Sequence, residues 1–365
     1  MTLMKCKICG NRTEITKILG ICINCIRDKP ELSKPFIKEA HRKSREKFNL
    51  PAEPPKEPKG VKCDLCANQC RIPENGKGYC GLRANKEGKI VHLGGTPEKG
   101  ILEWYYDPIP TNCVAQEFCA ASANVGYPKF SYSKGVEYGY KNLAVFYGSC
   151  SFNCLFCQNW HHRSLTTNLK LPVSSKELAD RVDEKTSCIC YFGGDPGPQL
   201  PHAIKTSELV REKSEILRIC LETNGTMNRK LLKKFAILSL ESGGCIKFDL
   251  KAWDENLQKA LCGVENKLAF KNFEYLAQFE REEPPFLVAS TLLIPGYVDV
   301  VEVRKIAEFI AELDSDIPYS LLAFYPNFYM SDLPTTSWTQ AKECLNAAKD
   351  SGLKKVRLGN IHLLR

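Results

Sequence analysis

The chain has 365 residues, of which 43% are hydrophobic and 25% are charged, and its formal net charge is +9. This composition is typical of a globular protein, and the length suits one large domain with an appendage or two ordinary domains. No stretch approaches the roughly 18 apolar residues of a transmembrane helix, and the N-terminus MTLMKCKICGN lacks the apolar core of an export signal. We therefore expect a cytoplasmic protein without a membrane partner. The mild positive charge permits an acidic partner and does not indicate nucleic acid.

Cysteines are unusually frequent, with 19 in the chain, and they gather in C-x2-C and C-x3-C patterns. In the cytosol such spacings indicate metal centres and not disulfides, because thiols stay reduced there. We therefore expect several metal sites, and we expect oxygen to damage them.

Residues 1–30 carry two C-x2-C pairs, made of Cys6, Cys9, Cys22 and Cys25. Four thiolates in paired knuckles close a tetrahedral site, as in a zinc ribbon. The spacing predicts a zinc-ribbon-like module with structural Zn²⁺, and a small iron centre is the alternative.

Residues 31–60 are rich in Pro, Lys and Glu, a composition typical of a linker between domains. A short helix is predicted over PFIKEAHRKSREKF, and an extended segment is predicted over NLPAEPPKEPKG.

Residues 61–140 are predicted to be a cysteine-rich extension that contains one short strand, KIVHLGG. Four cysteines close in sequence suit an auxiliary iron–sulfur cluster or a second zinc ion, and the spacing favours neither. These four are Cys63, Cys66, Cys70 and Cys80. Cys113 and Cys119 are interpreted as buried free thiols, with a ligand role as the alternative.

Residues 141–365 alternate apolar runs of strand length with amphipathic helices, the pattern of β/α units around a parallel sheet. The six predicted strands are LAVFYG, SCICYFGG, EILRICLE, CIKFDL, LVASTLLIP and YSLLAFYP. Capping patterns predict helix starts at Ser174 with Glu177, Asp299 with Glu302, and Ser337 with Gln340. The predicted fold class is α/β, and six units favour a partial (β/α)6 barrel of the TIM type over an open doubly wound sheet.

The stretch GSCSFNCLFCQNW places Cys150, Cys154 and Cys157 in a C-x3-C-x2-C loop directly after the first of these strands. Iron–sulfur clusters normally take four cysteine ligands, so three thiolates leave one iron of a [4Fe–4S] cluster open. An open metal position is typical of a catalytic site. A zinc knuckle with a distant ligand, or three unrelated cysteines, are the alternatives.

Polar motifs follow the later strands, at the C-terminal strand ends where barrels of this type hold their active sites. They are Gly193-Gly194-Asp195-Pro196, Glu222-Thr223-Asn224-Gly225, Asp249 with Lys251, Pro295-Gly296, and Phe324 to Asn327. The glycines would let the backbone approach a ligand closely. Each motif alone is an ordinary turn signal or ion pair, but their order behind a three-cysteine loop indicates one site.

The cysteine loop and these motifs resemble the radical S-adenosylmethionine (SAM) superfamily, in the branch related to pyruvate formate-lyase activating enzyme. The resemblance covers about residues 61–365 and includes CQNW, GGDP, ETNG, KFDLKAWDENLQKALCG, LIPG, FYPNFYMSDLPTT and RLGN. The segment CDLCANQCRIPENGKGYCGLR is most similar to the radical SAM member of the AmmeMemoRadiSam system.

The resemblance implies a [4Fe–4S] cluster held by the three loop cysteines, whose electron splits SAM into methionine and a 5′-deoxyadenosyl radical. It implies that the segment from Gly193 to Pro196 and the turn containing Glu222 and Asn224 bind the SAM amino group. Lys251, with Asp249 beside it, would meet the SAM carboxylate, and Phe156 would border the adenine. A reductant such as ferredoxin or flavodoxin is implied as a partner.

Two positions depart from the pyruvate formate-lyase activating enzymes, which carry an arginine and a histidine where this chain offers Ser290 and Tyr325. The missing arginine weakens the assignment of a glycyl-radical partner. His161 and His162 are interpreted as surface histidines, with a substrate-facing role as the alternative. We expect an enzyme that abstracts hydrogen from a protein or small-molecule substrate. The alternatives are a glycyl-radical-enzyme activating enzyme and a non-catalytic iron–sulfur or zinc adaptor for electron transfer.

Overall fold

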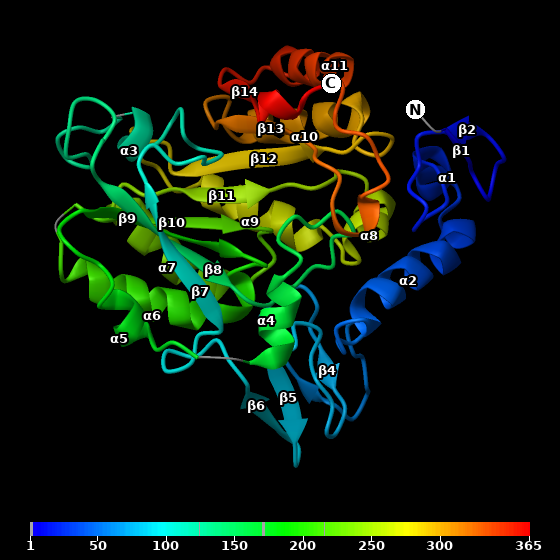
Figure 1. The fold of residues 1–365 in the computed structure, drawn as a ribbon, viewed down its shortest axis with the longest axis horizontal. Coiled ribbons are helices and arrows are strands. Elements are labelled where there is room, and N and C mark those ends of the chain that lie inside the picture. The colour runs from blue at the N-terminus through cyan, green and yellow to red at the C-terminus, as the bar shows by residue number, and fades with distance from the viewer. Residues whose placement is uncertain (1–2, 124, 170–171, 215) are drawn as a thin grey trace.

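A computed structural model describes residues 3–123, 125–169, 172–214 and 216–365 (Figure 1). Within these residues the central sheet has eight strands in the order β14-β13-β12-β11-β10-β9-β8-β7. Strands β8 to β14 are parallel to their neighbours, and β7 pairs antiparallel with β8 at one edge. The strands are β7 (Leu102–Pro108), β8 (Lys141–Tyr147), β9 (Thr186–Gly193), β10 (Arg218–Thr223), β11 (Ile246–Asp249), β12 (Leu287–Leu293), β13 (Tyr319–Ala323) and β14 (Val356–Gly359).

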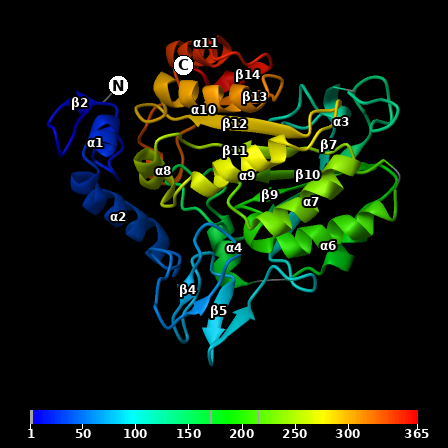
Figure 2. The same ribbon diagram turned by 180° about the vertical axis from the view of Figure 1, so that it is seen from behind.

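The parallel strands are apolar runs because such sheets are buried on both faces. Helices cover the outer face of this sheet (Figures 1 and 2). In β12, for example, six of the seven residues in LVASTLL are buried. The six predicted strands correspond to β8 through β13, so the predicted α/β partial barrel is confirmed. Strands β7 and β14 were not predicted.

The helices follow the strands in the expected order. They are α4 (His162–Asn168), α5 (Ser175–Ala179), η1 (Gly197–Gln199), α6 (Leu200–Arg211), α7 (Arg229–Glu241), α8 (Glu255–Cys262), α9 (Lys267–Ala277), α10 (Val300–Leu313), η2 (Phe328–Met330), α11 (Trp338–Asp350) and η3 (Ile361–Leu363). The predicted caps form, since the side chains of Ser174, Asp299 and Ser337 each accept a hydrogen bond from the third backbone N–H of their helix. None of the helices in the described part of the chain is long and apolar enough to cross a membrane.

The N-terminal segment precedes the barrel. Its elements are β1 (Met4–Lys5), β2 (Arg12–Thr13), α1 (Ile23–Asp28), α2 (Pro30–Glu46), β3 (Val61–Lys62), β4 (Arg71–Ile72), β5 (Arg83–Lys86), β6 (Lys89–His92) and α3 (Ala120–Ala123). The predicted KIVH strand is β6. Helix α2 begins earlier than the sequence predicted, because Pro30 occupies its first turn, where a missing N–H costs nothing.

Helix α2 runs from the first cysteine module past α8 to the β3–β6 region (Figures 1 and 2). Its buried His41 contacts the carbonyl oxygens of Lys259 and Ala260 in α8, at 3.0 and 3.1 Å. Residues before α2 are also held on the barrel, since Arg27 forms ion pairs with Asp299 and Glu302 at 3.0 and 2.6 Å. The predicted linker segment therefore includes a helix packed against the core.

Candidate active site and metal centres

The loop of residues 149–157, here called the cluster loop, begins where β8 ends. Backbone N–H groups of Asn153 and Leu155 donate to the carbonyl oxygens of Cys262 and Leu261, at 2.8 and 3.0 Å. These bonds fasten the loop to the end of α8. The side chain of Asn224 donates to the Cys150 sulfur at 3.7 Å, so one predicted site residue touches another.

The three loop thiols and the predicted strand-end residues line one pocket, here called the strand-end pocket. Its predicted members are Cys150, Cys154, Phe156, Cys157, Gly193, Gly194, Asp195, Glu222, Asn224, Asp249 and Lys251. The remaining predicted residue, Pro196, is buried and precedes η1. The convergence follows from topology, because parallel strands present their carboxyl ends at one edge of the sheet.

Gly193 ends β9 and Gly194 follows it, and close packing of the backbone, not the approach of a ligand, explains why both are glycine. A Cβ on Gly194 would lie 2.0 Å from the Ser149 carbonyl oxygen, and one on Gly193 would lie 2.5 Å from the Tyr147 nitrogen. Gly193 also has a φ of 118°, which disfavours side chains. Gly193 therefore lets the end of β9 pack against the end of β8, and Gly194 lets the chain pack against Ser149 of the cluster loop, where a larger residue would displace it.

Asp195 is buried, and hydrogen bonds to its own surroundings occupy its carboxylate. It accepts from the Thr223 hydroxyl at 2.7 Å, and from the backbone N–H groups of Asn224 and Gly197, both at 2.9 Å. Burial raises its pKa to about 6, although these donors oppose the shift. Asp195 therefore joins the ends of β9 and β10 beneath the pocket.

Lys251 forms an ion pair with Asp249 at 2.6 Å, and its ammonium lies 5.8 Å from the centre of the Phe156 ring. Burial alone would lower the pKa of Lys251, but the Asp249 carboxylate outweighs burial and raises it. The Ser290 hydroxyl donates a hydrogen bond to the Asp249 carboxylate at 2.6 Å and so orients it. Lysine is therefore a fixed positive charge in the pocket, which suits a carboxylate ligand.

Glu222 forms an ion pair with Lys247 at 2.8 Å, and the Lys247 side chain is 2% exposed. The sequence had not singled out Lys247, whose partner across the sheet is Glu222.

Arg163, which follows the tandem histidines, also lines the pocket. It is buried, donates to the Asn153 side chain at 3.0 Å, and leaves its Nε and Nη1 atoms without a partner. Arg45 of α2 is buried nearby, and no carboxylate pairs with either arginine among the ion pairs of the described residues. Buried charges without counterions are costly, so the two arginines fit an anionic group such as a thiolate-bound iron–sulfur cluster.

The pKa values of the three loop thiols are consistent with metal ligands. Burial raises the pKa of Cys150 and Cys157, so both thiols are uncharged at neutral pH unless a metal binds them. Contact with Cys262 and burial raise the pKa of Cys154 in the same way. The Cys262 sulfur lies 3.5 Å from that of Cys154, a contact between residues 108 positions apart that sequence reasoning missed.

The tandem histidines have different environments. His161 is exposed and stacks on Phe146, with ring centres 4.4 Å apart. His162 is 3% exposed and lines the strand-end pocket, so its prediction as a surface residue is wrong. Two of the predicted strand-end motifs do not line the strand-end pocket. In the motif from Phe324 to Asn327, Tyr325 is 51% exposed. In the Pro295-Gly296 motif, a Cβ on Gly296 would meet the backbone of Glu14.

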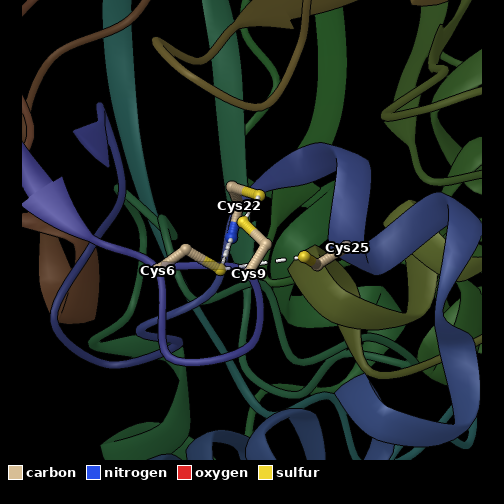
Figure 3. A group of neighbouring side chains, drawn as sticks. All are labelled: Cys6, Cys9, Cys22 and Cys25. Atoms are coloured by element: carbon tan, nitrogen blue, oxygen red, sulfur yellow. Dashed lines mark hydrogen bonds between the residues drawn. The ribbon is translucent and has the colours of Figure 1, made fainter. Parts of the chain in front are cut away.

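The N-terminal cysteine site consists of Cys6, Cys9, Cys22 and Cys25, whose sulfurs all lie within 4.8 Å of one another (Figure 3). Cys6 is 3.8 Å from Cys25, and Cys9 is 3.8 Å from Cys22. A tetrahedron with metal–sulfur bonds of about 2.3 Å has edges of about 3.8 Å. The site therefore has the size for one tetrahedral metal ion.

The auxiliary cysteine set, Cys63, Cys66, Cys70 and Cys80, lines a small pocket of its own. Among the described residues these sulfurs do not form a group as compact as the N-terminal site. The set lies against the cluster loop, because Ser149 donates to the Cys80 carbonyl oxygen and Asn68 donates to that of Ser151, at 2.8 and 2.7 Å.

The chain is similar to several known proteins. Residues 144–310 match the model of the Radical SAM superfamily. The chain is 24% identical to an uncharacterised protein, MJ0808, of Methanocaldococcus jannaschii, over 82% of this chain and 81% of that protein. It is 31% identical to a putative glycyl-radical enzyme activating enzyme, MJ1632, of the same organism, over 48% of this chain and 64% of that protein.

The pyruvate formate-lyase 1-activating enzyme of Escherichia coli is 23% identical, over 50% of this chain and 73% of that protein. Residues 144–310, which match the family model, include the cluster loop and the ends of β8 to β11. Residues 144–310 are therefore those of a radical SAM region, and the chain is similar to the pyruvate formate-lyase 1-activating enzyme and to a putative glycyl-radical enzyme activating enzyme.

Proposed function

We propose that Cys150, Cys154 and Cys157 ligate a [4Fe–4S] cluster at which SAM is reductively cleaved. When bound, the cluster and SAM supply a 5′-deoxyadenosyl radical, which abstracts hydrogen from a protein or small-molecule substrate. The observation that carries the proposal is the single pocket lined by the three loop thiols and the predicted residues of three further strand ends.

Different residues of the strand-end pocket would bind different parts of SAM. Lys251 would pair with the SAM carboxylate, and Glu222 with its ammonium, because each is the complementary charge. Phe156 would pack against the adenine. Asn224 orients Cys150 through its amide hydrogen bond.

Asp195 is proposed to act indirectly, because its carboxylate already accepts three internal hydrogen bonds. It would hold the segment from Gly193 to Pro196 in position for backbone contacts with the SAM amino group.

The choice of substrate rests on an arginine that the chain lacks. Ser290 stands where the pyruvate formate-lyase activating enzymes carry an arginine, and its hydroxyl is engaged by Asp249. We therefore favour a metabolite, or a protein other than a glycyl-radical enzyme, as the substrate. Activation of a glycyl-radical enzyme is the second candidate, supported by the 31% identity to a putative activating enzyme.

The other sites complete the proposal. We propose Zn²⁺ in the N-terminal cysteine site, and an auxiliary iron–sulfur cluster in the auxiliary cysteine set because its sulfurs are less compact. The chain would divide into a module at 1–30, a connecting segment at 31–60, an extension at 61–140 and the core at 141–365. A cytoplasmic ferredoxin or flavodoxin would supply the electron.

The test is anaerobic reconstitution of the full chain with iron and sulfide, followed by SAM and a strong reductant. We expect 5′-deoxyadenosine from the wild type and none from a Cys150→Ala, Cys154→Ala and Cys157→Ala triple variant. Cys344→Ala is the matched control, since it removes a buried thiol from α11, outside all the sites described. An intact cluster that yields no 5′-deoxyadenosine would refute the proposal.

Lys251→Gln tests the carboxylate contact separately. A hydrogen bond to a charged group contributes about 1.5–3 kcal/mol, so SAM should bind roughly 10- to 100-fold more weakly. Lys267→Gln is the matched control, since that side chain is 67% exposed. Equal SAM affinities for the two variants would contradict the assignment.

A further inference from the structure

A second cavity, here called the thiol cavity, lies on the inner face of the sheet below the strand-end pocket. Six cysteines from separate parts of the chain line it: Cys113, Cys119, Cys188, Cys190, Cys220 and Cys245. The segment that leads to α3 carries the first two and closes the cavity. In Figures 1 and 2, α3 lies at the opposite end of the sheet from α4 and α8.

The strand register explains how the other four thiols meet. In β9 and β10, Cys190 pairs with Cys220, and the next pair in the ladder sets Leu221 beside Ile246. Cys245, directly before β11, therefore continues a row of three thiols across neighbouring strands. Cys188 lies two residues before Cys190 and so points to the same face, one layer lower.

Two charged residues, Glu222 and Lys247, lie next to this row of thiols on the side of the strand-end pocket. Lys247 lies 3.2 Å from the Cys113 sulfur, 3.3 Å from the Cys190 sulfur and 2.8 Å from the Glu222 carboxylate. Neutral thiols are weak hydrogen-bond acceptors, whereas metal-bound thiolates carry charge and accept well. A buried ammonium facing two sulfurs is therefore better matched by thiolates than by thiols.

The cavity also contains polar atoms without a protein partner. Asn142 lines it and is 6% exposed, yet its side-chain oxygen has no hydrogen-bond partner, and the same holds for Nε of the buried Arg218. Buried polar atoms are normally satisfied. These two atoms indicate that the cavity holds something besides the side chains around it.

The spacing of the sulfurs indicates which metal centre would fit. No three of these six sulfurs form a group within 4.8 Å in the described part of the chain, in contrast to the N-terminal cysteine site. One tetrahedral ion needs such a group, because its ligand sulfurs lie about 3.8 Å apart. A polynuclear cluster holds its cysteine ligands farther apart and takes four of them.

We propose that the thiol cavity binds a further iron–sulfur cluster, held by Cys113, Cys190, Cys220 and Cys245 and hydrogen-bonded by Lys247. The cluster would lie one residue layer from the strand-end pocket, since Glu222 and Phe192 line both. It would thus be a further redox centre, next to the strand-end pocket. Binding of iron here does not depend on SAM cleavage.

The first test compares iron, sulfide and zinc in three reconstituted full-length proteins: wild type, a Cys190→Ser and Cys220→Ser double variant, and Cys344→Ser as the control. The double variant should lose one whole cluster, about two iron atoms for [2Fe–2S] or about four for [4Fe–4S]. Zinc retention and circular dichroism would show that it is folded. A folded double variant with as much iron as the control would overturn the proposal.

The second test keeps all the thiols and measures electron paramagnetic resonance during reductive titration. Lys247→Met should shift the reduction potential of a signal that added SAM does not perturb, because Lys247 neutralises charge beside two ligands. Lys251→Met is the comparison, since it should affect the SAM-sensitive signal. If Lys247→Met moves no SAM-insensitive signal, the cluster is not in the thiol cavity.

Discussion

His41 gives a prediction that links helix α2 to the cluster loop. The ring is 4% exposed, its Nε2–H group donates to carbonyl oxygens of α8, and its Nδ1 atom accepts from the Asn153 amide at 2.9 Å. This arrangement requires a neutral ring. Burial lowers the pKa of His41 from 6.5 to about 4, since a charged ring would lose its solvation.

The sign of the pH dependence follows directly. Between about pH 6.5 and pH 4 the unfolded chain binds a proton at His41 that the folded chain does not, so acidification favours unfolding. The free energy of unfolding contributed by His41 is complete above pH 6.5 and is lost as the pH falls towards 4. The full effect is about 3 kcal/mol, and about 1.3 kcal/mol of it is lost between pH 7.5 and pH 5.5.

The assay is anaerobic denaturant unfolding at pH 7.5 and pH 5.5 of wild type and His41→Gln. Glutamine can donate and accept at this position without titrating, while His162 and His202 are the same in both proteins and cancel. The wild type should lose about 1.3 kcal/mol more than the variant on acidification. Equal losses would refute the reasoning, because they would mean that His41 is charged in the fold or titrates normally.

Three further perturbations test other contacts. Glu137→Gln removes the partner of the buried Arg218, whose Nη1 donates to that carboxylate at 2.8 Å, and should cost about 3–5 kcal/mol in denaturant unfolding. Asp316→Asn, which breaks an exposed pair, should cost less than about 1 kcal/mol; equal costs would contradict this contrast. Arg163→Gln removes a buried positive charge beside the cluster loop and should make the reduction potential of the SAM-sensitive cluster more negative; an unchanged potential in a redox titration would count against that role. A chelator should release one zinc ion per chain and lower the unfolding temperature, whereas release of iron from the N-terminal cysteine site would show that zinc is the wrong metal.

The strand-end pocket was predictable because its residues follow a local rule. Each lies directly after an apolar run, and parallel strands bring their carboxyl ends together whatever the length of the helices between them. The caps at Ser174 and Ser337 were predictable for the same reason, since a cap and its N–H partner are three residues apart.

Strands β7 and β14 were missed because pairing, and not local pattern, makes them strands. Strand β7 is largely exposed and is defined by its antiparallel ladder with β8, and β14 is only four residues long. Cys262 was missed because its partner is 108 residues away. The thiol cavity could not be predicted from the sequence either. In the sequence Cys190, Cys220 and Cys245 resemble ordinary core residues, and only the pairing of the strands places them side by side.

The pair formed by Glu222 and Lys247 connects the strand-end pocket with the thiol cavity. When the sulfurs of Cys113 and Cys190 are neutral thiols, the charge of Lys247 is balanced by Glu222 alone, and that carboxylate has little attraction left for the ammonium of SAM. Thiolates of a bound cluster would take over the neutralisation of Lys247 and free Glu222 to face the strand-end pocket. The metal content of the thiol cavity would then set the affinity for SAM through the ion pair of Lys247 and Glu222.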